Sequence, residues 1–114
     1  MIIIKKLINW SLLNNNEVII HHKNVECDYN NNTLEFVEKD GYNFIDFDNN
    51  YYKRENNDHI VKLDFNENIM YYHLKEKKQD FKINFDGNIT INDNIIKIKY
   101  CIDKEEKEII IRLL

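Results

Sequence analysis

Residues 96–102 read IKIKYCI, and this stretch decides the fold class of the chain. Its large side chains stand at alternate positions: Ile96, Ile98, Tyr100 and Ile102. Lys97 and Lys99 occupy positions between them. Because successive side chains of an extended chain point to opposite faces, this period of two predicts a β-strand with one apolar face and one charged face.

The same pattern recurs along most of the chain. Further strands are predicted in the runs at 31–38, 41–47, 59–65, 68–75, 80–85 and 108–114. Short polar turns separate the runs, at 39–41, 48–50, 55–58, 66–68, 86–88, 92–94 and 103–106. Two of these turns contain Asp-Gly, which supplies the positive φ that tight hairpins need. Connections this short leave no room for crossover helices, so neighbouring strands are expected to pair antiparallel.

These features predict an all-β fold. We expect a single antiparallel meander of about eight to ten short strands, from Val18 to the end, that closes into a small barrel and so removes its edges. Residues 1–114 are expected to form one domain, because the length suits one domain and no linker or repeat interrupts the chain. Residues 2–13 fit either a first strand that ends in a turn at Asn14–Asn16 or a short helix, and the strand is favoured.

The charge of the chain limits its expected partners. Twenty acidic residues outnumber sixteen lysines and arginines, which gives a net charge of −4. A nucleic-acid-binding protein normally presents a basic face, and its aromatic residues lie among basic ones, whereas here they are mixed with acids along the sequence. We therefore expect no nucleic-acid partner. No apolar stretch is long enough to span a bilayer, so we expect a cytoplasmic protein with no membrane partner.

Conventional catalytic and metal-binding motifs are missing from the sequence. The only serine, Ser11, lies outside any G-x-S-x-G motif, and two glycines cannot supply a phosphate-binding loop. His21 and His22 are adjacent, so in a strand they point to opposite faces and cannot share a metal ion. Cys27 and Cys101 fall in apolar runs, where a free cysteine behaves as a small hydrophobic residue. We predict no catalytic residue, metal ion or cofactor.

The densest group of polar and aromatic side chains is FIDFDNNYYKREN, at residues 44–56. In one interpretation it is a binding site, where Arg54 holds an anionic group while Tyr51 or Tyr52 stacks or hydrogen-bonds beside it. In a later strand, Tyr71 and His73 share a face and add to the candidate ligand-binding residues.

The other interpretation, which we favour, makes the same stretch an ordinary hairpin. Ile45 and Phe47 then face the core, and Arg54 pairs across the strands with Asp46 or Asp48. An exposed pair of this kind contributes about 1 kcal/mol or less, so Arg54→Ala would change the stability only slightly.

The succession of strands from residue 33 to residue 114 resembles the YwiB-like family, which consists of small bacterial calycin-type β-barrels of unassigned function. The resemblance lies in the order and spacing of TLEFVEKDG, YNFIDFDNN, YYKREN, HIVKLDF, NIMYYHL, IIKIKYCI and EIIIRLL. It implies a calycin-like barrel in a bacterial protein. It contains no catalytic motif, and we transfer no functional residue from it.

The predicted function is that of a non-catalytic binding module, either a monomer or a homodimer. A protein-interaction module with a filled core is favoured, because the chain has no alanine and its alternating faces carry bulky side chains. Such a barrel would bind a protein through its outer face or an unpaired strand edge. The alternative is a carrier that holds a small, partly apolar or anionic ligand in the barrel mouth.

Overall fold

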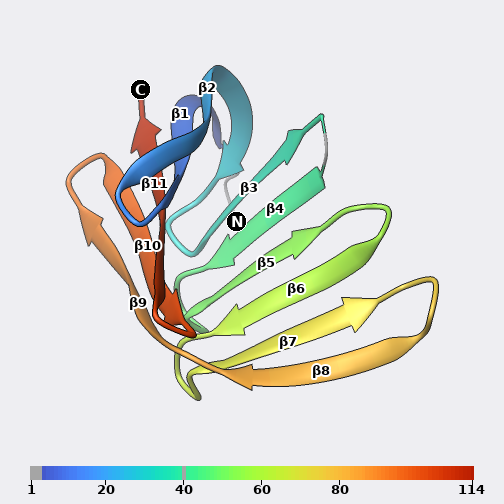
Figure 1. Ribbon diagram of the computed structural model, residues 1–114. Helices are drawn as coiled ribbons and strands as arrows, with labels where there is room; N and C mark the ends of the chain where they lie inside the picture. Colours follow the sequence, from blue (N-terminus) through green and yellow to red (C-terminus); the bar gives the residue numbers. More distant parts are fainter. Residues whose placement is uncertain (1–3, 40) are drawn as a thin grey trace.

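The computed structural model describes residues 4–39 and 41–114 (Figure 1). They form eleven strands: β1 (Ile4–Asn14), β2 (Glu17–Tyr29), β3 (Thr33–Glu38), β4 (Gly41–Asp46), β5 (Tyr51–Glu55), β6 (His59–Asp64), β7 (Ile69–Leu74), β8 (Gln79–Asn84), β9 (Asp86–Asn92), β10 (Ile95–Ile102) and β11 (Glu105–Leu113). Ile2 and Ile3 of the predicted first strand and Asp40 of a predicted turn lie outside the described residues. Within the described ranges, no helix is long and apolar enough to cross a membrane.

All eleven strands belong to one antiparallel sheet, in the order β8-β7-β6-β5-β4-β3-β2-β1-β11-β10-β9. The first and last strands pair with each other, from Ile8 opposite Leu113 to Asn14 opposite Lys107. This pairing joins the two ends of the meander, so the sheet curls into a nearly closed barrel. Its one break lies between β8 and β9, which are consecutive in the chain but are not neighbours in the sheet (Figure 1).

The predicted all-β antiparallel barrel is confirmed. The ten strands β2 to β11 make up the meander predicted from Val18 onward, and residues 4–14 add an eleventh, because they form the favoured strand and not a helix. The turn predicted at Asn14–Asn16 falls on Asn15 and Asn16, whose φ angles are 50° and 68°. Asparagine adopts this left-handed conformation more readily than most residues, so two asparagines suit a two-residue hairpin loop.

The turn predicted at residues 86–88 is wrong, and the error falls at the break in the barrel. β9 already begins at Asp86, a single residue separates it from β8, and no described glycine has a positive φ. One residue is too short for a hairpin loop, so the two strands diverge from Phe85 instead of pairing. Gly87 has another role, because an added Cβ would lie 2.3 Å from the carbonyl oxygen of Lys99 on β10.

An irregularity in the β1–β2 pairing bends the longest hairpin of the sheet. The register shifts between Ile8 and Trp10, and on β2 the extra residue Asn24 takes a φ of 57°. The Asn9 side chain accepts a hydrogen bond of 3.0 Å from the Asn24 backbone N–H, which satisfies the group that the ladder leaves unpaired. Such bulges increase local twist, and here the bend lets β2 pair with β1 along its length and with β3 at its end.

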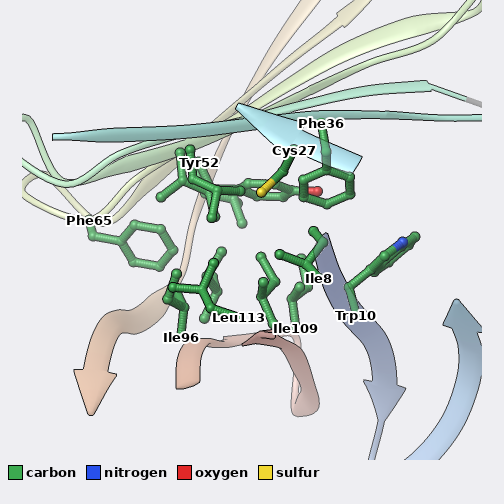
Figure 2. Packing of buried hydrophobic residues seen from close by; sticks show 14 of the residues in the cluster. Ile8, Trp10, Cys27, Phe36, Tyr52, Phe65, Ile96, Ile109 and Leu113 are labelled. Carbon is green, nitrogen blue, oxygen red and sulfur yellow. The ribbon is translucent and has the colours of Figure 1, made fainter. Parts of the chain in front are cut away.

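Side chains from opposite walls fill the interior of the barrel (Figure 2). Figure 2 shows one wall from β10 and β11 facing another from β2, β3 and β5, with β1 at the side: Ile96, Ile109 and Leu113 against Cys27, Phe36 and Tyr52, beside Ile8 and Trp10. Five core residues expose 0% of their surface: Ile8, Leu34, Ile45, Ile98 and Ile111. Of the inward positions predicted from IKIKYCI, Ile96 and Ile98 lie in the core, and Tyr100 and Ile102 are partly buried against it. The described cysteines are both free thiols.

The stretch at 44–56 forms the β4–β5 hairpin, as favoured. β4 ends at Asp46, whose carboxylate lies beneath the turn and accepts three hydrogen bonds. The donors are the backbone N–H of Asp48 at 3.1 Å and the backbone and side-chain amides of Asn49, both at 2.9 Å. Asp46 therefore fixes the turn that joins the two strands.

We expect Gly87→Ala to destabilise the fold by about 3 kcal/mol, because the new Cβ would clash with the backbone of β10 and force β9 away from it. Gly41→Ala is a control with a milder clash, since an added Cβ at Gly41 would lie 2.9 Å from its nearest contact, the Glu55 carbonyl oxygen. Urea unfolding measures both. Equal losses in the two variants would show that the close approach at β10 is not the cause.

Acid is expected to weaken the fold through Asp46. Burial acts to raise the pKa of its carboxyl, but the hydrogen bonds from Asn49 and Asp48 and the positive charge of Lys62 outweigh it and lower the pKa below the ordinary 3.8. A carboxyl with a lowered folded-state pKa stabilises fully above its unfolded pKa, and this contribution disappears as the pH falls through the folded pKa.

Asp46→Ala should therefore cost about 1–2 kcal/mol at neutral pH and progressively less at pH values below about 4. Asp48→Ala is the control, because the Asp48 side chain belongs to the same turn and is exposed. Urea unfolding over a pH series measures both variants. A cost for Asp46→Ala that stays constant into strong acid would contradict the role of the charged carboxylate.

Candidate functional site

The structure divides the five candidate ligand-binding residues between the two faces of the sheet. Tyr52 and Arg54 lie on the inner face of β5, where Tyr52 is 4% exposed. Tyr51, Tyr71 and His73 lie on the outer face and line one hollow of about 400 Å³. The five residues therefore do not form a single site, and each face has to be considered separately.

The inner residues belong to a polar cluster at the margin of the core. The Tyr52 hydroxyl donates a hydrogen bond of 2.5 Å to Oδ1 of Asn43, and Nδ2 of Asn43 lies 3.3 Å from Oε1 of Glu38. The same Glu38 oxygen lies 2.7 Å from Nη2 of Arg54. Three adjacent strands, β3 to β5, thus supply a connected network of four side chains, of which Asn43 is 1% exposed.

The predicted pairing of Arg54 with Asp46 or Asp48 is wrong. Asp46 is occupied by its own turn on the outer side, whereas Arg54 projects inward and reaches across β4 to Glu38 on β3. The pair is also less exposed than a surface pair, since 25% of the Arg54 side chain and 7% of the Glu38 side chain are accessible. Nε of Arg54 is buried and has no hydrogen-bond partner among the described residues.

Two tyrosines near Arg54 remain protonated across the ordinary pH range. Burial raises the pKa of Tyr52 well above its ordinary value, against the opposing effect of the Arg54 charge. Burial likewise raises the pKa of Tyr100 on β10, and Arg54 again acts in the opposite direction. Arg54 therefore lies within electrostatic reach of both walls of the barrel, and both hydroxyls are neutral.

A groove of about 500 Å³ opens between the two walls beyond this cluster. One side comes from β6 and β7 and the other from β10, β11 and their turn: Val61, Met70 and Tyr72 against Tyr100, Ile102, Asp103, Glu105 and Lys107. Val61 is the cross-strand neighbour of Arg54. The groove is mainly apolar with a charged rim, so its chemistry suits a small amphipathic molecule.

The outer hollow has a different character. Besides Tyr51, Tyr71 and His73, it is lined by Lys53 and Lys62 from the neighbouring strands. Nδ1 of His73 lies 2.6 Å from Oδ1 of Asp80, and the Tyr71 hydroxyl donates a hydrogen bond of 2.9 Å to Glu67. The hollow combines aromatic rings with ammonium groups on an open surface, which favours an anionic or aromatic ligand over an apolar one.

Sequence reasoning missed the residues that give each face its chemistry. Alternation in HIVKLDF places Lys62 on the polar face, but only the register of β5 against β6 brings it opposite Lys53. Glu38 lies 16 positions before Arg54 (54 − 38), and no local pattern connects them. The signal that could have identified Glu38 is its parity with Leu34 and Phe36, since a carboxylate on a core-facing position needs a partner.

We expect Arg54→Ala to destabilise the fold by about 3 kcal/mol, well above the 1 kcal/mol or less that an exposed pair would give. The reason is that the variant leaves the nearly buried carboxylate of Glu38 without its cation. The double variant Arg54→Met with Glu38→Gln should recover most of the loss, because it removes both charges and keeps the volume. Urea unfolding of Arg54→Met, Glu38→Gln and their combination measures the coupling.

Lys75→Ala is the matched control for this measurement. Its Nζ lies 2.8 Å from Oε2 of Glu55, close to the length of the Arg54–Glu38 pair, but 34% and 39% of the two side chains are exposed. Its loss should be well below that of Arg54→Ala, because solvent screens an exposed pair. A similarly small loss in Arg54→Ala would mean that the inner pair is solvated like a surface pair.

No group of three or more histidine, cysteine, aspartate or glutamate side chains among the described residues is placed to hold a metal ion. Comparisons of the chain with protein-family models, with curated proteins and with solved structures gave no match.

Proposed function

We propose that the protein is a non-catalytic interaction module that binds an extended segment of a protein partner along β8. The observation that carries the proposal is the break in the barrel, which leaves β8 with β7 as its single partner strand. One side of β8 therefore presents unpaired backbone N–H and C=O groups. An extended peptide can satisfy them by adding as a further strand, a common mode of peptide recognition.

The side chains of β8 support strand addition. All six of its residues are exposed, including two large apolar residues that face the interior side of the sheet. Phe81 is 45% exposed and Ile83 is 38% exposed. The Phe81 ring lies 6.4 Å from the ring of Tyr72 on β7, so an added strand would extend an existing apolar row.

The second edge, β9, is less suited to this role. Its first residues are held tightly against β10 at Gly87, and Ile89 packs against the core. Ile91, at 54% exposed, is the large apolar side chain that β9 presents. Burying one isolated isoleucine gives a partner less apolar contact than burying an adjacent pair.

The residues of β8 also define the chemistry of the partner segment. Positions opposite Phe81 and Ile83 would carry apolar side chains, because they extend the inner face. Positions opposite Asp80 and Lys82 would carry charges of the complementary sign, because they extend the outer face. The predicted partner is thus a short segment that alternates apolar and charged residues. A second copy of β8 would present such an alternation too, which gives the homodimer.

A small, partly apolar or anionic ligand in the groove between β6–β7 and β10–β11 is the second candidate function. The observation that favours it is the volume of about 500 Å³ beside Tyr72 and Tyr100. The interaction module is preferred because the centre of the interior is already filled with fully buried side chains. Both functions are compatible with the resemblance to the YwiB-like barrels and with a cytoplasmic protein, which remain predictions.

To test the proposal, random peptides of about ten residues, the length of a long strand, would be displayed and selected on the folded protein. We expect selected peptides to alternate apolar and charged residues, and amide hydrogen exchange should show new protection on β8. Phe81→Ser together with Ile83→Ser should weaken binding about tenfold or more, because each apolar contact contributes on the order of 1 kcal/mol.

Ile91→Ser on β9 is the matched control and should leave binding unchanged. Selected peptides that protect β9, or none that bind β8 more tightly than about 100 μM, would refute the edge proposal. Native mass spectrometry of the gently purified protein tests the second candidate separately. A bound mass of a few hundred daltons that Tyr72→Ala abolishes would favour the carrier, and the homodimer would appear as a doubled mass that the β8 variant abolishes.

A further inference from the structure

The outer face of the sheet carries a row of residues that the sequence does not show as a unit. Cross-strand pairing places one residue from each of five successive strands side by side: Phe44 on β4, Lys53 on β5, Lys62 on β6, Tyr71 on β7 and Lys82 on β8. We call this set the lysine row. With strands about 4.8 Å apart, it crosses about 19 Å of the surface.

The charges of the lysine row are not balanced by ion pairs. Lys53 lies directly opposite Lys62, and like charges in that arrangement destabilise a sheet. Among the described residues, none of the three lysines forms an ion pair within 4.0 Å, although the six pairs that do form include other lysines. At distances beyond an ion pair, the charge of Lys62 contributes to lowering the pKa of Asp46, and the charge of Lys53 contributes to lowering the pKa of Glu55.

Tyrosine rings hold two of these lysines in place. Nζ of Lys62 lies 4.5 Å from the centre of the Tyr51 ring, and Nζ of Lys82 lies 5.5 Å from the centre of the Tyr71 ring. A cation above an aromatic face is attracted to it, which reduces the freedom of an otherwise mobile side chain. The ammonium groups are thus positioned before any ligand arrives, and ordering them on binding costs less.

Acidic residues border the lysine row on both sides. On one side the outer face carries Asp46 and Asp64, the cross-strand neighbours of Tyr51. On the other side it carries Glu55 and Asp80. A wide anionic surface such as a bilayer or a duplex would bring its phosphates over these carboxylates. A narrow chain of anions that follows the row from Lys82 to Lys53 would avoid them, and it would end at Phe44, because Glu35 on β3 lies directly opposite Phe44.

We propose that the lysine row binds single-stranded nucleic acid, with phosphates at Lys53, Lys62 and Lys82 and bases against the rings of Phe44, Tyr51 and Tyr71. Charge complementarity along a narrow line requires an extended polyanion, and interleaved aromatic rings favour one that carries bases over an acidic peptide. The net charge of −4 predicts no nucleic-acid partner, but it averages over faces that the register keeps apart. The inference does not depend on strand addition at β8.

Fluorescence anisotropy with a labelled oligothymidylate of about twelve nucleotides tests the proposal on the whole protein. With three phosphate contacts, log affinity should fall against log salt with a slope of about −2. Lys53→Gln, Lys62→Gln and Lys82→Gln should each make this slope shallower by about 0.7. Tyr71→Leu should weaken binding about tenfold and leave the slope unchanged, because a ring stacks on bases and pairs with no phosphate.

Lys97→Gln is the matched control, because Lys97 is an exposed strand lysine on β10, away from the lysine row. It should leave both affinity and slope unchanged. Lys53→Gln removes a like-charge contact and should unfold at the same or a higher urea concentration than the parent, so a loss of binding in it cannot come from misfolding. Lys62→Gln also removes a charge that favours the Asp46 carboxylate, so its loss of binding counts only where its urea unfolding curve matches that of the parent.

Three results would overturn the proposal. The first is no binding of the oligothymidylate at about 50 mM salt, where phosphate contacts are strong. The second is an equal loss in Lys97→Gln, which would mean diffuse attraction to any lysine. The third is displacement of the oligonucleotide by polyglutamate at equal charge concentration, which would assign the row to an acidic peptide instead.

Discussion

The pairing of β1 with β11 is the constraint on which the rest of the structure depends. Seven residue pairs, from Ile8–Leu113 to Asn14–Lys107, join the two ends of the meander. The sheet stays open at the single-residue connection at Phe85, which is too short for a hairpin loop. Because the two ends of the meander are joined, the free edges of the sheet are β8 and β9.

The inner polar cluster is compatible with this arrangement because it lies at the margin of the packed interior. The deepest positions of β4 to β6 are apolar, with Ile45, Tyr52 and Leu63 side by side. The next position along each strand brings Asn43 beside Arg54 and Arg54 beside Val61, close to the groove. A charge at the deepest row would lose all its hydration, whereas here it keeps some and gains a carboxylate.

The sequence predicts the strands and their faces, because a period of two depends on each strand alone. Ile96 and Ile98 lie inside as their alternation requires, and the hairpin at 44–56 forms as favoured. The features that the sequence does not predict depend on how the strands pair and pack against one another. The Asp86-Gly87 pair has the composition of a turn, yet close packing on β10 decides the role of Gly87. Neither the Glu38 partner of Arg54 nor the row that includes Lys53 and Lys62 can be found without the register.

The peptide-binding edge proposed at β8 and the lysine row share one residue, Lys82. Its backbone belongs to the free edge of β8, while its side chain ends the lysine row above Tyr71. A peptide strand paired with β8 would place an acidic side chain opposite Lys82, where that side chain and a phosphate would compete for the same ammonium group. Lys53 and Lys62 lie two or three strands further in and remain free. A peptide at β8 and a nucleic acid at the lysine row are therefore expected to weaken each other's binding only by the contribution of Lys82. A peptide bound at β8 would lower the affinity of the lysine row for nucleic acid without abolishing it.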